Sequence, residues 1–312
     1  MGIINNRKIW YIISGVIVLA SIFSILFFGL KLGIDFTGGS LLEIEYINSA
    51  TGGRPEIPVL QEKINSLGLG NVVLQPSGDN GLLVRSRDLT EEEHQRLLSA
   101  LGDSVSKETE SPSELKEIRF DSIGPVIGQE LKQKSWIAIT LVVVMIVLYI
   151  AFAFRKVSKP VSSFKFGLMA IVALAHDVII PLGIFAILGK IFSIEIDVLF
   201  ITAILTILGF SVHDTIVVFD RTRENLKKGI AKNFEETVGM SVNQTIVRSI
   251  NTSITVLVVL LTIFFLGGET TKWFALALAI GVAIGTYSSI FLASPLLVTM
   301  NKLQEKRKTK KK

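Results

Sequence analysis

Residues 136–154 read WIAITLVVVMIVLYIAFAF, a run without a single charged side chain. A helix rises about 1.5 Å per residue and the hydrocarbon core of a bilayer is about 30 Å thick, so roughly 20 such residues span a membrane. Five further stretches are long and apolar enough: Ile9–Leu30, Phe166–Leu188, Ile196–Asp220, Ile246–Leu266 and Trp273–Met300. The sequence therefore predicts an α-helical membrane protein with six transmembrane helices, of which Trp136–Phe154 is the second.

The composition of the chain agrees with this class and excludes several others. Of its 312 residues, 49% are hydrophobic and only 19% are charged, which is too apolar for an ordinary soluble protein. There is no cysteine, and the histidines, His94, His176 and His213, form no His-x-x-x-His pair. No nucleophile–base set, phosphate loop or basic patch with interleaved aromatic residues occurs. The sequence thus predicts no catalytic site, no metal, no organic cofactor and no nucleic-acid partner.

Lysine and arginine are distributed unevenly between the two sides of the predicted spans. One side has two basic residues before the first span, four in residues 155–165, five in residues 221–232 and seven from Lys302 to Lys312. The short loops of the other side contain only Lys190 and Lys272. Because short basic segments stay in the cytoplasm, both termini are predicted to be cytoplasmic. The same basic segments are expected to contact anionic lipid headgroups.

This topology divides the chain into four parts. They are a cytoplasmic N-terminus with the first transmembrane helix (1–30), an extracytoplasmic domain (31–134), a five-helix transmembrane bundle (135–300) and a basic cytoplasmic tail (301–312). The extracytoplasmic segment contains 11 basic and 17 acidic residues, so the positive surplus of the chain lies in the segments that flank the membrane.

The inserted segment 31–134 shows the pattern of a small α+β domain. Strands are predicted at Leu41–Ile47, Asn71–Gln75, Leu82–Ser86 and Leu115–Asp121, and helices at Glu56–Leu67 and from Thr90 to Leu101. The second helix begins with the capping box Thr-x-x-Glu and is expected to end at Gly102. Residues 78–81, Gly-Asp-Asn-Gly, favour a tight hairpin. The order of strands and helices is the split βαβ arrangement of ferredoxin-like domains.

Two charges inside the predicted spans form the main candidate site. Inserting a charged group at mid-membrane costs roughly 2.5–3.5 kcal/mol of free energy on insertion scales, so a charge inside a span indicates a functional or structural role. Asp214 lies in the inner half of the fourth span and Arg248 begins the fifth, at a similar depth. Two interpretations stay open: a protonatable carboxylate that faces a cation and alters helix packing when protonated, or a structural ion pair between helices.

Further polar residues accompany this pair. Asn251, Thr252 and Thr255 follow Arg248 at helical spacing and share its face. His176 and Asp177 lie near the centre of the third span, and His213 directly precedes Asp214. These residues are predicted to belong either to an ion relay or to helix packing, with packing hydrogen bonds favoured for the two histidines and a structural role for Asp177.

Several motifs together resemble the SecD/SecF family. The first is Gly-Ile-Asp-Phe-Thr-Gly-Gly-Ser at 33–40, immediately after the first span. The others are IGPVIG at 123–128, AHD at 175–177, FSVHDTIVVFDR at 210–221, NQT at 243–245 and RSINTS at 248–253. The six-span layout extends the match to nearly the whole chain.

This resemblance implies a resistance–nodulation–division-type fold and a membrane subunit that assists the Sec translocon channel. It implies that the proton gradient, or a sodium gradient in some members, pulls unfolded secretory proteins outward across the cell membrane of a bacterium or archaeon. A separate SecD subunit would supply six further spans. Asp214 and Arg248 match the ion-relay positions, and the family signature comprises Gly33, Asp35, Gly38 and Gly39.

The signature also has a mechanical explanation from its residue types. Two glycines allow the chain to turn sharply where the first span meets the inserted domain. Asp35 could cap that turn or contact a partner, and capping is the simpler role.

Two other functions fit the same six-span layout. A small-molecule or lipid exporter of the same superfamily would be expected to have a larger external portion with a substrate pocket. A scaffold without ion traffic would use the charge pair only to hold helices, and an apolar replacement would preserve its function.

Overall fold

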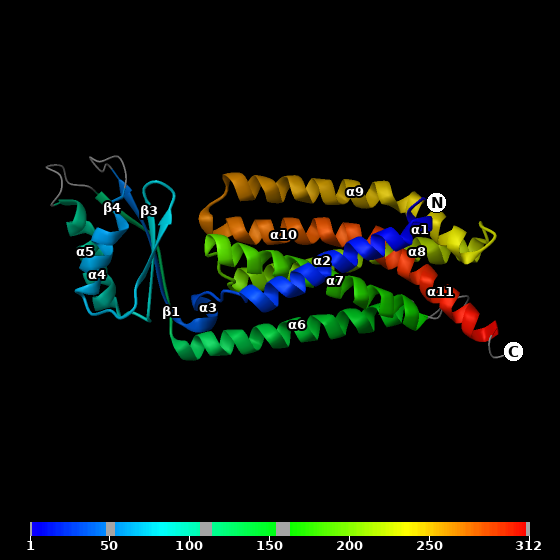
Figure 1. Cartoon of the computed structure of the whole chain (residues 1–312), viewed down its shortest axis with the longest axis horizontal. Helices are drawn as coiled ribbons and strands as arrows, with labels where there is room; N and C mark the ends of the chain where they lie inside the picture. The colour runs from blue at the N-terminus through cyan, green and yellow to red at the C-terminus, as the bar shows by residue number, and fades with distance from the viewer. Residues whose placement is uncertain (1, 48–53, 107–113, 154–162, 310–312) are drawn as a thin grey trace. The chain divides into compact units, whose positions relative to one another are not determined.

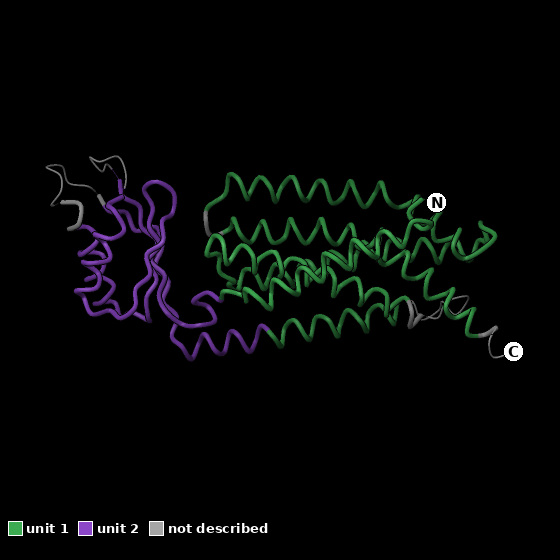
Figure 2. Tube along the Cα trace, viewed as in Figure 1, with its two compact units in different colours: residues 1–31, 136–312 green, residues 32–135 purple. Residues whose placement is uncertain are grey.

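The computed structural model describes residues 2–47, 54–106, 114–153 and 163–309. The chain forms two compact units, shown in Figure 2: unit 1 comprises residues 1–31 and 136–312, and unit 2 comprises residues 32–135. From the sequence, the inserted domain was expected at 31–134. The predicted end of the second span at Phe154, the basic residues of 155–162 and the tail residues 310–312 lie outside the described residues.

The described part of the chain contains six helices that are long and apolar enough to cross a membrane (Figure 1). The prediction of six spans is therefore confirmed. A short helix, α1 (Gly2–Asn5), precedes the spanning helices. The first five spanning helices are α2 (Arg7–Phe28), α6 (Pro125–Ala153), α7 (Ser163–Phe192), α8 (Val198–Lys228) and α9 (Phe234–Leu266). The sixth is made of α10 (Glu269–Ser288), the π-helix η1 (Ser289–Ala293) and α11 (Ser294–Thr309).

Several of these helices are longer than the apolar runs that predicted them. Helix α8 continues to Lys228, and α9 begins at Phe234, before the apolar part starts. Capping residues set these ends: the Asn233 side chain accepts a hydrogen bond from the backbone of α9, and Gly229 ends α8 in the left-handed conformation, with φ of 60°. Hydropathy marks only the part of a helix that suits lipid, so it underestimates helix length.

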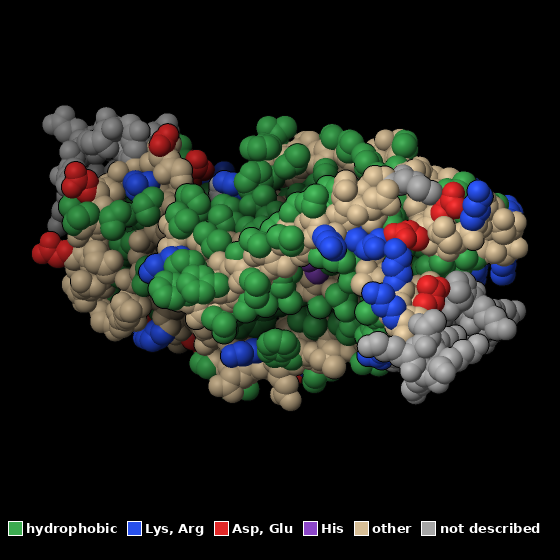
Figure 3. Space-filling model, turned by 45° about the vertical axis from the view of Figure 1, so that its right-hand side comes forward, with side chains coloured by type: hydrophobic (Ala, Val, Ile, Leu, Met, Phe, Trp, Pro, Cys, Tyr) green, Lys and Arg blue, Asp and Glu red, His purple; other side chains and the backbone are tan. Residues whose placement is uncertain are grey.

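Unit 1 has inner and outer helices. About half of the most apolar part of α7 and of α8 is buried within the chain, compared with 17% for α2 and α9 and 6% for α6. Large apolar side chains such as Leu26, Leu141 and Phe265 are exposed on the outer helices. On the face drawn in Figure 3, hydrophobic side chains dominate the surface over the spanning helices. Such a surface is suited to lipid or to another membrane protein rather than to water.

Unit 2 contains a four-stranded antiparallel sheet in the order β2-β3-β1-β4. This is the order of the split βαβ arrangement, so the predicted ferredoxin-like fold is confirmed. The strands are β1 (Gly39–Ile47), β2 (Val73–Ser77), β3 (Gly81–Ser86) and β4 (Glu114–Ile123), and the helices are α3 (Ile34–Thr37), α4 (Ile57–Asn65) and α5 (Glu91–Ser106).

One core holds unit 2 together. Alternate residues of β1, namely Leu42, Ile44 and Tyr46, point to the same face and are each at most 1% exposed. Buried pairs at i and i+4 on α4 and α5 cover them, Leu60 with Ile64 and Leu97 with Leu101. Burial also raises the pKa of the Tyr46 hydroxyl.

The second helix of unit 2 differs from its prediction at one end. The capping box is formed as expected, because Thr90 N donates to the Glu93 carboxylate at 3.0 Å and Glu93 N donates to Thr90 Oγ1 at 3.4 Å. The helix does not end at Gly102, however, but continues to Ser106. A glycine costs only about 1 kcal/mol in a helix interior, too little to stop a helix that can continue.

Candidate functional site

Asp177 lies near the middle of α7 and is completely buried. Its Oδ1 atom is 2.8 Å from His176 Nδ1. Its Oδ2 atom accepts hydrogen bonds from Ser288 Oγ of α10, at 2.7 Å, and from Ser211 Oγ of α8. Three helices therefore meet at one carboxylate, and these donors offset the cost of burying it.

Asp214 lies on α8 and is 2% exposed. Thr286 Oγ1 of α10 donates a hydrogen bond to its Oδ2 at 3.1 Å, and His213 Nδ1 lies 3.7 Å from its Oδ1. The Thr286 hydroxyl also hydrogen-bonds Ser253 of α9. Asp214 therefore has fewer close donors than Asp177, and a chain of hydroxyl groups leads from it to the next helix.

Arg248 does not contact Asp214 in this structure. Its side chain is exposed on α9, and no ion pair within 4.0 Å joins the two among the described side chains. The contacts of the Asp214 carboxylate are therefore Thr286 and His213 rather than Arg248. Asn251 and Thr252 are exposed on α9 as well. The polar stripe predicted from their spacing is present, but it faces outward.

A second stripe explains this outward orientation. Ser241, Thr245, Ser249 and Ser253 repeat every four residues along α9 and are all buried. Small side chains allow close approach of neighbouring helices, so this stripe packs inward and the larger polar residues lie on an exposed face of the helix beside it. Both stripes have helical spacing, and the sequence by itself does not distinguish them.

The hydroxyl donors of the site, Ser211, Ser253, Thr286 and Ser288, were missed by sequence reasoning. Their signal was weak, because single serines and threonines are common in membrane helices, where their hydroxyls bond the carbonyl one turn earlier. Thr286 and Ser288 immediately precede η1, whose first residue, Ser289, lies 2.8 Å from Thr215 through the two hydroxyl oxygens. A π-helix often marks a functional position in a helix.

Pro295 accounts for this π-helix. A proline lacks the N–H that would bond the carbonyl four residues earlier, and its ring clashes with that carbonyl. In α11 the carbonyl concerned belongs to Phe291, which lies inside η1.

The predicted signature lies at the start of unit 2. Gly33 precedes α3, Asp35 occupies the first turn of α3, and Gly38 follows it with φ of 75° and ψ of 164°, a region open to glycine. Gly39 has φ of 127°. A Cβ atom on Gly38 would lie 2.9 Å from Pro125 Cα, and one on Gly39 would lie 2.7 Å from the Ser86 carbonyl oxygen. Both the backbone conformation and close packing therefore require these glycines.

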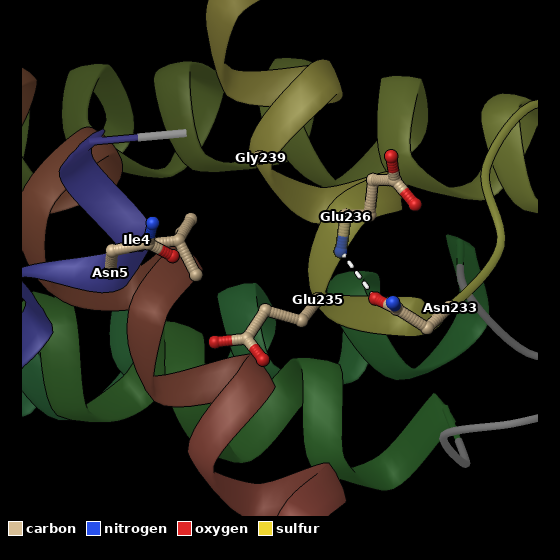
Figure 4. Close-up of a pocket in the computed structure, with 6 residues that line it drawn as sticks. All are labelled: Ile4, Asn5, Asn233, Glu235, Glu236 and Gly239. Carbon is tan, nitrogen blue, oxygen red and sulfur yellow. Dashed lines mark hydrogen bonds between the residues drawn. The ribbon is translucent and has the colours of Figure 1, made fainter.

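A small pocket of about 290 Å³ lies between α1 and the start of α9 (Figure 4). It shares no residue with the buried carboxylates. At its edge Glu235 forms ion pairs with Arg7 of α2 and Lys302 of α11, which join three helices. The pocket is lined by Ile4, Asn5, Asn233, Glu235, Glu236 and Gly239.

The chemistry of the site follows from its donor set. Among the described residues, no three or more histidine, aspartate and glutamate side chains are grouped so that they could hold a metal ion. The buried carboxylates instead bind hydroxyl groups and an imidazole. Ionisable groups inside membrane spans mark ion or substrate pathways. The fold and the site thus define a polytopic membrane protein with carboxylates buried inside its spanning helices.

Comparison with known proteins gives the family. The model of the family described as protein export membrane protein SecD/SecF, C-terminal, matches residues 103–303, and the SecD/SecF GG motif matches residues 23–46. The chain belongs to the SecD/SecF family, as the motifs predicted.

The relatives agree with this assignment. The protein translocase subunit SecF of Thermobaculum terrenum is 43% identical over 304 residues, which cover 96% of this chain and 93% of the relative. The subunit SecF of Anaerolinea thermophila is 38% identical, with the same coverage of 96% and 93%.

A solved structure of the same family extends the comparison to the fold. SecDF of Thermus thermophilus, a translocon-associated membrane protein, matches with a TM-score of 0.78 and 29% identity. The match covers 97% of this chain but only 39% of the SecDF chain. This protein thus spans less than half the length of SecDF.

Proposed function

We propose that the chain is a translocase subunit that works with a SecD partner and couples the proton gradient, or a sodium gradient, to late stages of Sec-dependent protein export. It acts as a transport component rather than an enzyme, and the coupling ion takes the place of a cofactor. The observation that carries the proposal is Asp214, a carboxylate 2% exposed inside a membrane span and hydrogen-bonded to a hydroxyl group of another helix.

Protonation of Asp214 would change the contacts between α8 and α10. The charged carboxylate accepts a hydrogen bond from Thr286, lies 3.7 Å from His213 Nδ1 and attracts the cationic Arg248 side chain. The protonated acid loses this attraction and becomes a donor itself. Because Thr286 also bonds Ser253, the change reaches α9 as well. Asp214 is thus placed to convert an ion-binding event into helix movement.

The energy of a membrane gradient is sufficient for such a movement. Carrying one charge through 100 mV is worth about 2.3 kcal/mol. Each 1.4 kcal/mol changes an equilibrium constant tenfold, so this energy biases two arrangements of the helices by roughly fiftyfold. The relative SecDF is also known in a super-membrane-facing form, which matches this chain with a TM-score of 0.66 rather than 0.78.

The exposed stripe on α9 supports the need for a partner. A charged side chain that faces lipid at mid-membrane costs roughly 2.5–3.5 kcal/mol on insertion scales. Arg248, Asn251 and Thr252 are all exposed in the isolated chain. A SecD subunit with its own polar residues would cover them, and it would supply the part of SecDF that this chain does not span. Unfolded secretory proteins and the Sec translocon channel complete the proposed set of partners.

The orientation is proposed from the distribution of charge. Both termini and the basic segments would lie on the cytoplasmic side of the cell membrane, next to anionic lipids, and unit 2 would lie outside. Lys and Arg side chains gather at one end of the face in Figure 3, together with acidic ones.

An export assay with and without an ion gradient tests the proposal. Vesicles that contain the chain, its partner and the translocon are loaded with a partly translocated precursor, ATP is removed, and a gradient is then imposed. Asp214→Asn and Arg248→Met should assemble normally and lose the gradient-dependent step. Asp197→Asn is the control, because it makes the same chemical change on the same helix and asparagine also caps a helix. Gradient-dependent export by both variants at the normal level would refute the proposal.

A further inference from the structure

The proposed function uses Asp214 and leaves the more deeply buried Asp177 without a role. Helix association does not need a second buried charge here. Helices α8 and α10 already approach closely through Gly281 and Gly285: a Cβ atom on Gly281 would lie 2.2 Å from Ile207, and one on Gly285 would lie 3.0 Å from Ser211 Cβ. Since small residues bring these helices together, the cost of burying Asp177 points to another purpose.

The donors to Asp177 lie beside the groups that form the Asp214 site. Ser211 precedes Asp214 by about one helical turn on α8, so the two side chains share a face. Ser288 follows Thr286 by two residues on α10. The contact between Thr286 and Asp214 joins α10 to α8, and both helices are also hydrogen-bonded to Asp177 close to that contact.

His176 extends the same network to α2. Its Nδ1 atom bonds the other oxygen of Asp177, and its ring stacks on Tyr287 with centroids 6.0 Å apart. The Tyr287 hydroxyl lies 3.1 Å from Ser14 Oγ of α2. Asp177 of α7 thus bonds α8 and α10 directly, and it is connected to α2 through His176 and Tyr287.

We propose that Asp177 is a positioning residue for Asp214. It fixes α8 and α10 against α7 so that Thr286 stays within hydrogen-bonding distance of the Asp214 carboxylate. The value of this positioning for transport rests on the proposed function, but the geometric statement concerns the folded chain alone. A role in packing only would differ in one respect: loss of Asp177 would then lower stability without changing the surroundings of Asp214.

The reactivity of the Asp214 carboxyl group tests this difference. A hydrophobic carbodiimide, dicyclohexylcarbodiimide, labels carboxyl groups within membrane proteins, and peptide mass spectrometry identifies Asp214 as the labelled residue. The rate is measured on the purified full-length chain at fixed pH. The variants are Asp177→Leu, which keeps the approximate size of the side chain and accepts no hydrogen bond, Ser211→Ala and Ser288→Ala. The control is Ser24→Ala, which removes a buried hydroxyl whose hydrogen bond, among the described residues, goes to the Ala20 carbonyl of its own helix.

Each of the three variants should raise the labelling rate of Asp214 by about fivefold, the change that corresponds to roughly 1 kcal/mol of lost hydrogen bonding. Ser288→Ala should add no further rise when Asp177 is already leucine, because that hydroxyl acts through Asp177 and leucine accepts no hydrogen bond. If Asp177→Leu does not fold, Ser288→Ala alone decides, since it removes a single oxygen atom. A rise of less than about twofold in the folded variants, or an equal rise in Ser24→Ala, overturns the proposal.

The result is separable from that of the proposed function. Labelling is measured without a partner, a gradient or export. Normal export by Asp214→Asn would refute ion coupling and leave the positioning result intact, whereas unchanged labelling would refute positioning and leave ion coupling intact.

Discussion

Substitution of Gly38 by alanine should destabilise unit 2 more than Gly128→Ala or Gly102→Ala does. Gly38 ends α3 with φ of 75° and ψ of 164°, a conformation that costs a residue with a Cβ atom about 1–3 kcal/mol. The new Cβ would also lie 2.9 Å from Pro125 Cα, and overpacking against backbone costs about 1–3 kcal/mol more. The expected loss of stability is therefore about 2–6 kcal/mol.

Two other glycines of the chain separate these contributions. Gly128 lies in α6 without a positive φ, but its Cβ would lie 2.9 Å from Gly38 N. Gly128→Ala should therefore cost about 1–3 kcal/mol from overpacking, offset by the about 0.5–1 kcal/mol that alanine gains over glycine in a helix. Gly102 lies within α5 and its Cβ would meet nothing within 4 Å. Gly102→Ala should therefore stabilise unit 2 by about 0.5–1 kcal/mol.

Hydrogen exchange of the amides in β1 and β4 measures the effect, because these amides exchange when unit 2 opens. Gly38→Ala should speed their exchange by at least about 30-fold, since each 1.4 kcal/mol corresponds to a factor of ten. Gly102→Ala should slow it. If Gly38→Ala and Gly128→Ala both exchange at the rate of the unchanged protein, the close contact between the signature and α6 is not a constraint on the fold.

Two further predictions concern single polar contacts. Thr286→Val removes the hydroxyl donor to Asp214 and should reduce gradient-dependent export about tenfold. Thr286→Ser keeps the donor, so export by this variant should remain close to normal. Equal export by both variants would contradict the role of the hydroxyl. In unit 2, hydrogen bonds from the Arg87 side chain and the Thr90 N–H lower the pKa of Glu93 from 4.5 to about 2. The resulting stability is present above pH 4.5 and is lost as the pH falls to about 2, so the unfolding temperature should fall further over this interval than it does in Glu93→Gln. An identical fall in the unfolding temperature of both proteins would contradict a stabilising role of the Glu93 carboxylate.

Much of the fold could be predicted from the sequence because single residue patterns determine it. An uncharged run long enough to cross a membrane has few alternatives. The alternation of Leu42, Ile44 and Tyr46 fixes which face of β1 is buried, and the box of Thr90 and Glu93 fixes where α5 begins. Helix ends that depend on polar caps outside the apolar run, and the π-helix before Pro295, were not apparent from hydropathy.

The candidate site was predictable only in part. The cost of a charge inside a span identifies Asp177 and Asp214 without any structure. The partners of these carboxylates were not identifiable from the sequence. Ser211 and Ser288 lie on other helices than Asp177, and Thr286 lies on another helix than Asp214. Which side of each helix faces its neighbour depends on packing. For the same reason the spacing predicted a stripe at Arg248 but not that the stripe would face outward.

Ion movement through the assembled complex tests the central claim most directly. The chain and its SecD partner are reconstituted with the translocon in vesicles that contain a proton-sensitive or sodium-sensitive dye, and a precursor is translocated under an imposed gradient. The unchanged protein should show an ion flux that begins with translocation, and Asp214→Asn should show none while its assembly is unchanged. An equal, translocation-dependent flux in Asp214→Asn would contradict the assignment of Asp214 to the ion pathway.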